Sequence, residues 1–229
     1  MICTLSGGVG TGKTITSVKL AIESAKKNTV LTNFSIKKLK NYIRLKKGDI
    51  LIEKFNDKGK LDGYDINWDF WEAHKNGDVF LDEVHNLINS RSSMSTVNKK
   101  YSEWIAQIRK IWGQSGDQNY LNTLSRMSNE LFHRYHQQVY ARSNNIFLIT
   151  QKPRKIDVNF KELCHVHIQC SKQVVGDKVL IFQDHYLGND QLSGIEMMEM
   201  GLKPKRTYFI ANPYFNRYDS YEIVRGEFL

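Results

Sequence analysis

The stretch Gly7-Gly8-Val9-Gly10-Thr11-Gly12-Lys13-Thr14 decides the fold class of this 229-residue chain. It satisfies the pattern G-x-x-x-x-G-K-[ST], in which a glycine-rich loop presents successive main-chain N–H groups to phosphate oxygens. The residues before it, Ile2 to Ser6, form a short apolar run, and the spacing of Ile15, Val18 and Ile22 predicts a helix after it. A strand, the loop and a helix therefore follow one another in the order that a phosphate-binding loop requires.

Each part of this loop has an expected task. Glycines allow the main chain to approach a phosphate closely, and the positive end of the following helix favours an anion. We expect the whole loop to bind ATP: Gly7, Gly8, Val9, Gly10, Thr11, Gly12, Lys13 and Thr14. The ammonium group of Lys13 should reach the β- and γ-phosphates, and the hydroxyl of Thr14 should ligate Mg²⁺. A chance glycine-rich turn is the alternative, against which the flanking strand and helix argue.

Two adjacent acids follow the apolar run Val79-Phe80-Leu81, and they are candidates for the second half of such a site. Asp82 would hold the Mg²⁺, directly or through water, while Glu83 would polarise the attacking water. This arrangement predicts hydrolysis rather than phosphate transfer to a small molecule. Taken alone, an Asp-Glu pair after an apolar run is more often the start of a helix, but the upstream loop favours the catalytic interpretation.

A third polar residue, Gln151, ends the apolar run Ile146 to Thr150. If this strand lies between the other two in the sheet, the amide of Gln151 lies beside the γ-phosphate and can sense it. The alternative is a strand-ending polar residue that faces solvent, which spacing alone would favour.

Apolar runs of strand length alternate with segments of helical spacing along most of the chain. This alternation predicts an α/β fold with a mainly parallel sheet and helices on both faces. We expect a single domain over residues 1–229, with a core at 1–185 and an appendage at 186–229 that includes a β-hairpin built from Tyr208 to Ile210 and Tyr221 to Val224. We also expect helices over Lys37 to Lys47, over Trp68 to His74 with an end at Gly77, and over the helically spaced apolar positions Tyr101 to Trp112 and Leu121 to Tyr135.

Composition sets the class of partner. Lys and Arg number 33 against 24 for Asp and Glu, which gives a net charge of +9. Such a charge attracts nucleic acid, although a generic basic surface explains it equally well. No run approaches the roughly 18 apolar residues of a membrane span, and no leader precedes the phosphate loop, so we expect a cytoplasmic protein with no stable membrane insertion.

These segments resemble the FtsK-HerA superfamily of DNA-pumping ATPases, and within it the viral genome-packaging ATPases and the ATPase domain of zonular occludens toxin-like phage assembly proteins. The resemblance rests on Gly7 to Thr14, on Val79 to Glu83 with His85 and Ser90-Arg91-Ser92 after it, and on Ile146 to Gln151. It covers the chain from its first residue to the region of Cys170. It implies a RecA-like sheet, a ring, usually a hexamer, and a sensor role for Gln151.

The resemblance also implies an arginine that completes a neighbouring subunit's site, because a fixed guanidinium can neutralise the charge that spreads in the transition state. The family motif places it shortly before the sensor strand, where Arg142 fits best. The usual Arg-His pair and a slightly longer spacing are missing there. Arg134 and Arg91 are rivals, and a solvated arginine is the alternative.

A run of basic residues is a candidate contact for DNA phosphates in the pore of a ring. It consists of Lys37, Lys38, Lys40, Arg44, Lys46 and Lys47. A second candidate patch follows the sensor, at Lys152, Arg154 and Lys155. A solvated face is the more common use of such a run.

The resemblance implies a motor that hydrolyses ATP and moves double-stranded DNA into a viral capsid, with capsid or portal components as partners and the host cytoplasm as its location. The first alternative is a zonular occludens toxin-like ATPase that drives assembly and export of a filamentous virion. We rank it second because its relatives usually carry a transmembrane span after the ATPase, which this sequence does not show. An alternative of another class is a nucleotide-dependent switch or scaffold with slow turnover.

Overall fold

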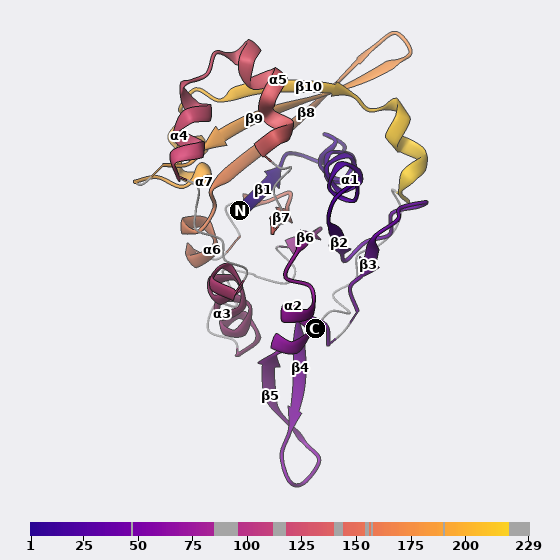
Figure 1. The fold of residues 1–229 in the computed structure, drawn as a ribbon, viewed down its shortest axis with the longest axis vertical. Helices are drawn as coiled ribbons and strands as arrows, with labels where there is room; N and C mark the ends of the chain where they lie inside the picture. The colour runs from indigo at the N-terminus through magenta and orange to yellow at the C-terminus, as the bar shows by residue number, and fades with distance from the viewer. Residues whose placement is uncertain are drawn as a thin grey trace.

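The computed structural model describes residues 1–46, 48–84, 96–111, 118–139, 144–153, 156, 158–189 and 191–219. Within these ranges the larger sheet has eight strands, in the order β10-β9-β8-β1-β7-β6-β2-β3. The strands are β1 (Ile2–Ser6), β2 (Thr29–Thr32), β3 (Tyr42–Arg44), β6 (Gly77–Leu81), β7 (Ile146–Ile149), β8 (Val166–Val175), β9 (Lys178–Leu187) and β10 (Lys205–Ile210). A separate hairpin, β4 (Leu51–Phe55) and β5 (Leu61–Ile66), projects from the body of the molecule (Figure 1).

The strands from β8 to β3 run parallel, and β9 and β10 add to them in antiparallel fashion. The helices are α1 (Lys13–Ser24), α2 (Trp68–Ala73), α3 (Thr96–Ile111), α4 (Gln118–Arg126), α5 (Asn129–Val139), α6 (Val158–Glu162), α7 (Gly194–Glu199) and the 3₁₀-helix η4 (Asn212–Arg217). The prediction of an α/β fold with a mainly parallel sheet and helices on both faces is confirmed.

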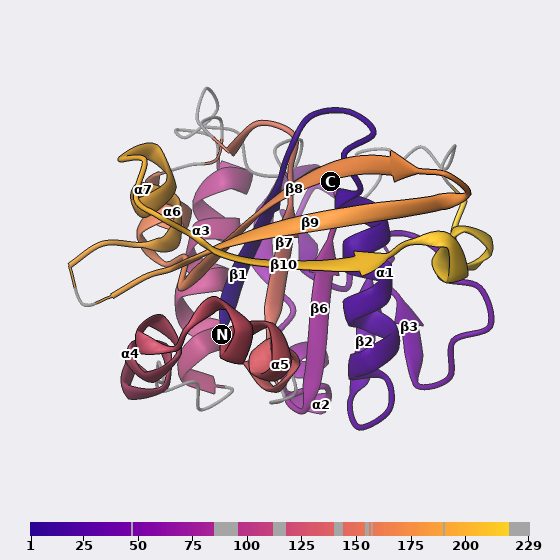
Figure 2. The same cartoon turned by 90° about the horizontal axis from the view of Figure 1, so that it is seen from above.

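Alternate residues of the central strands face two separate cores, because successive side chains of a strand point to opposite faces. On β7, Ile146 and Leu148 pack into a cluster with side chains of α2, α3 and α6, among them Trp104. Phe147 and Ile149 face the other way, into a cluster with side chains of α1, α4 and α5. Figure 2 shows α1, α4 and α5 on one side of the sheet. The continuous apolar run of β7 is thus explained by burial on both faces.

The basic stretch from Lys37 to Lys46 is not a helix, contrary to our prediction. It is a loop followed by β3, whose residues pair in parallel with β2. Lys38 and Asn41 have φ angles of 55° and 54°, in the left-handed region that an α-helix cannot contain. Lysine favours helices locally, but pairing with β2 decides the structure here. Lys47 lies outside the described residues.

Two other element ends differ from expectation. Helix α2 ends at Ala73 and Gly77 begins β6 without a left-handed φ; a Cβ there would crowd the carbonyl oxygens of His74 and Thr29, at 3.1 and 3.2 Å. The predicted Leu121 to Tyr135 helix is two helices, because the Ser128 hydroxyl accepts a hydrogen bond from the N–H of Leu131 and starts α5.

The carboxyl-terminal strand β10 extends the sheet on its outer side. β10 pairs with β9, with Lys205 opposite His185 and Ile210 opposite Leu180. The partner that we expected for it, residues 221–224, lies outside the described residues. In the part of the chain that the structure describes, no helix has the length and apolar character needed to cross a membrane.

Candidate nucleotide-binding site

Three neighbouring parallel strands bring the predicted site residues to one edge of the sheet. β7 lies between β1 and β6, with Ile146 in register with Ile2 on one side and Val79 on the other. Because the strands are parallel, their carboxyl ends meet at the same edge. The phosphate loop follows β1, the two acids follow β6 and Gln151 follows β7, so the condition that we set for Gln151 is met.

The phosphate loop has a backbone that only glycine permits at two positions. Gly7 and Gly12 have φ angles of 143° and 94°. A Cβ on Gly7 would lie 2.6 Å from the carbonyl oxygen of Cys170, and one on Gly12 would lie 2.4 Å from Ile181 Cδ1. Strands β8 and β9 therefore support the loop from outside. Because these glycines carry no Cβ, the loop can form a cradle of main-chain groups of the kind that binds phosphate oxygens.

Lys13 points its ammonium group back over this loop. Its Nζ donates a hydrogen bond of 2.8 Å to the carbonyl oxygen of Gly8, and the residue is 6% exposed. Burial lowers the pKa of Lys13, while the nearby negative charges of Glu83 and Asp82 act to raise it. A buried cation at the opening of the cradle is the group that a triphosphate tail needs for neutralisation.

Thr14 and Asp82 come together from opposite sides of β7. The Thr14 hydroxyl donates a hydrogen bond of 3.1 Å to Asp82 Oδ2. Burial raises the pKa of Asp82 to about 6, against the effect of the hydrogen bond that its Oδ1 accepts from the Glu83 N–H. A hydroxyl and a carboxylate are the hard oxygen donors that Mg²⁺ prefers, so the pair fits the expected metal.

Glu83 is held by two features of the fold. Its φ angle is 51°, an uncommon value for a residue other than glycine, which turns the chain directly after β6. The side-chain amide of Gln151 donates a hydrogen bond of 2.7 Å to Glu83 Oε1. The structure thus brings together Lys13, Thr14, Asp82, Glu83 and Gln151.

Asn33 belongs to this site and was missed by sequence reasoning. Its side-chain oxygen accepts from the N–H of Asp82 at 2.7 Å, and its side-chain N–H₂ donates to the carbonyl oxygen of Asp82 at 2.9 Å. The residue is 1% exposed and directly follows β2, the strand beside β6. A polar residue at the carboxyl end of a buried strand was the available signal, as it was for Gln151.

The arginine candidates are not brought to the site within the described residues. Arg142 and Arg91 lie outside those residues, as do His85 and the Ser90 to Ser92 segment. Arg134 is exposed on α5, which packs against β10 at the edge of the sheet, with β9 and β8 between it and β1.

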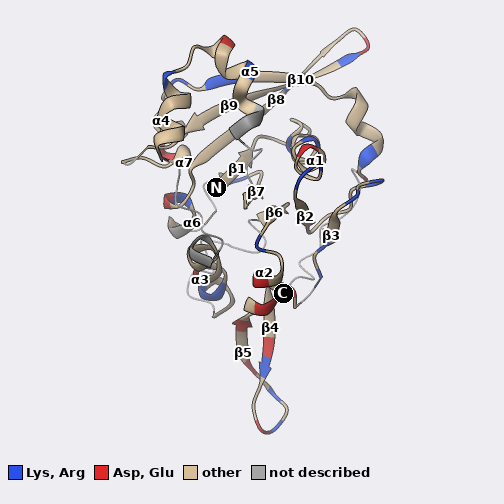
Figure 3. Cartoon of the chain, in the orientation of Figure 1, with Lys and Arg blue, Asp and Glu red and all other residues tan. Residues whose placement is uncertain are grey.

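The basic candidates for DNA contact are on the surface. The side chains of Lys37, Lys38, Lys40, Arg44 and Lys46 are exposed. Figure 3 shows blue segments along the stretch around β3. Lys152 is also exposed, whereas Arg154 and Lys155 lie outside the described residues.

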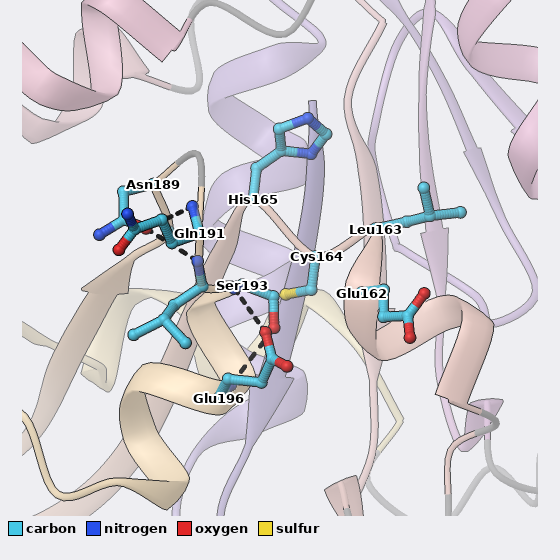
Figure 4. A pocket seen from close by; sticks show the side chains of 10 residues that line it. Glu162, Leu163, Cys164, His165, Asn189, Gln191, Ser193 and Glu196 are labelled. Carbon is cyan, nitrogen blue, oxygen red and sulfur yellow. Dashed lines mark hydrogen bonds between the residues drawn. The ribbon is translucent and has the colours of Figure 1, made fainter.

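A cavity of about 390 Å³ lies at the opposite edge of the sheet (Figure 4). His165 and Cys164, in its lining, precede β8, and the N–H of His165 bonds to the carbonyl oxygen of Ile2 at the start of β1. One carboxylate in the lining, Glu196, accepts a hydrogen bond from the N–H of Ser193 as part of a helix cap. The cavity lies away from the phosphate loop, and we assign it no part in the site.

Comparison with solved structures finds similar proteins, among them the following three. The N-terminal domain of zonular occludens toxin from Neisseria meningitidis is 17% identical, with 95% of this chain and 98% of that chain covered and a TM-score of 0.48. The genome packaging NTPase B204 from Sulfolobus turreted icosahedral virus 2, solved in complex with ATP-gammaS, is 8% identical over 80% and 91% of the two chains, with a TM-score of 0.37. The flagellar accessory protein FlaH from Methanocaldococcus jannaschii is 11% identical over 91% and 84%, with a TM-score of 0.37.

Comparison with curated proteins finds no match. The family model described as zonular occludens toxin (Zot) matches residues 1–221. This match includes the phosphate loop, both acids and Gln151. The chain therefore belongs to the zonular occludens toxin family and is a Zot-like P-loop NTPase.

Proposed function

We propose that this chain hydrolyses ATP with Mg²⁺ at the edge formed by β1, β7 and β6. One observation carries the proposal: Gln151 bonds to Glu83, and Thr14 bonds to Asp82, across strands that are far apart in the sequence. A site that only bound nucleotide would not require a carboxylate held by an amide next to the metal-binding pair.

Each residue has a role that follows from its position. The loop N–H groups and Lys13 bind the phosphates, and Thr14 and Asp82 hold Mg²⁺, which when bound neutralises charge on the phosphates. Glu83 accepts a proton from a water molecule, and Gln151 orients the carboxylate of Glu83 for that task. Asn33 fixes the main chain of Asp82.

Replacement of Glu83 by Gln tests the proposal. General base catalysis is worth roughly 10²–10⁴-fold, so we expect the Glu83→Gln variant to lose at least about a hundredfold in ATP turnover while its affinity for ATP is retained. Phosphate release and binding of a fluorescent ATP analogue measure the two quantities. Glu72→Gln, a matched change at an exposed position of α2, is the control. Unchanged turnover in Glu83→Gln would contradict hydrolysis by this site and favour a nucleotide-dependent switch or scaffold.

We further propose that hydrolysis drives a ring-shaped motor, a hexamer, that moves double-stranded DNA. The net charge of +9 and the exposed cations from Lys37 to Lys46 support a polyanionic partner. In the ring, Arg142 would complete the site of a neighbouring subunit. Capsid or portal components would be the further partners of a packaging motor in the host cytoplasm.

A second motor role is supported by the family match over residues 1–221. In this role the same ATPase cycle drives assembly and export of a filamentous virion. Both roles use the site described above. They differ in what ATP hydrolysis moves, which is double-stranded DNA in one role and the assembling virion in the other.

The ATPase rate with and without double-stranded DNA separates the two roles, and the oligomer mass is measured beside it. Stimulation by DNA supports packaging, whereas no response to several DNA forms favours virion assembly. The basic stretch is tested with the double variant Lys38→Gln/Lys40→Gln. The slope of log affinity for DNA against log salt concentration should become shallower by about one for each phosphate contact that is lost. Lys58→Gln/Lys60→Gln, two exposed lysines next to the projecting hairpin's strands, is the matched control.

A further inference from the structure

The segment from Ala211 to Tyr218, which we call the strap, connects the outer strands of the sheet to the nucleotide site. It begins at β9, where the N–H of Ala211 donates to the carbonyl oxygen of Val179. Its 3₁₀-helix η4 then packs against α1. Figure 1 shows this segment in yellow, passing α1 and reaching the stretch that precedes β3.

Arg217 fastens the far end of the strap to the loop after β2. Its carbonyl oxygen accepts from the N–H of Lys37 at 2.7 Å. Its guanidinium donates to the carbonyl oxygens of Lys37 and Lys38, at 3.1 and 3.0 Å. Three hydrogen bonds from one residue, to a loop about 180 positions away in the sequence, fix the two segments together.

Tyr218 extends the contact toward the site. It packs against the cluster formed by Ile15, Ile181 and Ala211, of which Ile181 borders Gly12. Burial raises the pKa of Tyr218, and the negative charge of Asp82 raises it further. The end of the strap therefore lies beside α1, the helix that follows the phosphate loop.

The loop that Arg217 holds is the loop that holds Asp82. Asn33 is four residues before Lys37 and makes two hydrogen bonds to the main chain of Asp82. Between them, Phe34 and Ile36 are buried in the core beside α1. A continuous set of contacts thus runs from the strap through Lys37 and Asn33 to Asp82.

We propose that the strap is a positioning element: it holds the loop after β2, and through Asn33 it sets the position of Asp82 for Mg²⁺. This inference rests on the proposed function of the site. Because coupling between two sites is reciprocal, metal binding in turn stabilises the strap.

The test is the Arg217→Ala variant, with Arg206→Ala as the matched control. Arg206 is also an exposed arginine with a bidentate partner, Asp184, but lies on β10, away from the site. We expect Arg217→Ala to raise the Mg²⁺ concentration needed for half-maximal binding of a fluorescent ATP analogue about tenfold. Analogue binding without Mg²⁺ should be unchanged in both variants. Should Arg217→Ala fail to fold, Arg217→Lys, which keeps the charge and the main-chain bond, replaces it.

The outcomes separate this inference from the proposed function. If the wild-type protein shows no Mg²⁺-dependent binding, the proposed function fails. If the wild-type protein shows it and Arg217→Ala behaves like Arg206→Ala, the strap has no positioning role. A second readout is hydrogen exchange of residues 211–218, which should slow by severalfold when Mg²⁺ and the analogue are bound; an unchanged rate would also overturn the inference.

An Asn33→Ala variant tests whether the strap acts on Asp82 through Asn33. If the strap acts through Asn33, the double variant Asn33→Ala/Arg217→Ala should raise the Mg²⁺ requirement no more than Asn33→Ala alone, because coupled residues are non-additive. If the double variant instead raises the Mg²⁺ requirement by the product of the two single-variant factors, the strap does not act through Asn33.

Discussion

The phosphate loop and the acidic edge lie on either side of β7, and they are held in place by different forces. The loop is shaped by packing against main chain and an aliphatic side chain, where Gly7 meets Cys170 and Gly12 meets Ile181. The acidic edge is shaped by side-chain hydrogen bonds, from Gln151 to Glu83 and between Asn33 and Asp82. Packing leaves little room to adjust, whereas hydrogen bonds can exchange partners.

This difference indicates which half of the site can respond to the rest of the molecule. We expect the phosphate loop, which rests against β8 and β9, to keep its shape. The acids depend on Asn33 and Gln151, so a shift of the loop after β2 changes their positions.

Gly12→Ala should have the largest effect, because it changes the phosphate loop, the part of the site that is shaped by packing. A left-handed alanine costs about 1–2 kcal/mol, and the contact with Ile181 adds about 1–3 kcal/mol of overpacking. We expect nucleotide affinity to fall at least about 30-fold, measured by titration with a fluorescent ATP analogue.

Gly10→Ala is the control for this loss. Gly10 has a φ of 72°, but a Cβ there meets no described atom within 4 Å. Only the backbone cost applies, so affinity should fall about tenfold. Equal losses in the two variants would show that backbone conformation alone, and not packing against β9, shapes the loop.

Asp82→Asn should stabilise the protein in the absence of Mg²⁺. The pKa of Asp82 is raised from 3.8 to about 6, so the folded state binds a proton more tightly than the unfolded state, and the associated stability is lost as the pH rises through this range. At pH 7.5 the ionised carboxylate costs about 1–3 kcal/mol of the free energy of unfolding, which the neutral amide recovers. Urea unfolding in EDTA at pH 7.5 and at pH 4 measures the gain, which should disappear at the lower pH.

The matched change for this measurement is Asp62→Asn, at an exposed position of β5. It should alter the free energy of unfolding little at either pH. A stability gain in Asp82→Asn that persists at pH 4 would mean that the charge of Asp82 is not its cause.

Gln151→Ala should have the smallest effect of the series. It removes one hydrogen bond to the carboxylate of Glu83, and such bonds to charged groups are worth about 1.5–3 kcal/mol at most. Because water replaces part of this contact, we expect kcat to fall about tenfold while nucleotide affinity is unchanged. Gln169→Ala, at an exposed position of β8, serves as the control in the same steady-state assay. A loss of affinity equal to the loss of kcat would assign Gln151 to binding instead.

Local sequence patterns predicted the central strands and the residues that follow them. The glycine pattern and the apolar runs at β1, β6 and β7 are short-range signals, and parallel pairing brings Asp82, Glu83 and Gln151 to one edge without further information. These signals failed where distant contacts decide the structure. The local sequence of the lysine-rich stretch predicts a helix, but in the structure its end pairs with β2 and forms β3.

Asn33 and Arg217 show the same limit within the site. The local sequence marks Asn33 only as a polar residue that ends a buried strand, and its role comes from its hydrogen bonds to Asp82 across the sheet. Arg217 meets Lys37 across 180 positions of sequence. No periodicity or spacing in a single sequence encodes a contact of this separation, whereas glycine requirements are encoded in the residue itself.

β7 acts as a spacer with a fixed width. Ile146 is in register with Ile2 on one side and Val79 on the other, and neighbouring strands lie about 4.8 Å apart. The gap between the lysine and the carboxylates is therefore set at about two strand spacings by main-chain hydrogen bonds. Evolution can exchange the side chains at this edge, but a one-residue insertion in β7 would turn Phe147 and Leu148 to the wrong layers and shift Gln151 away from Glu83.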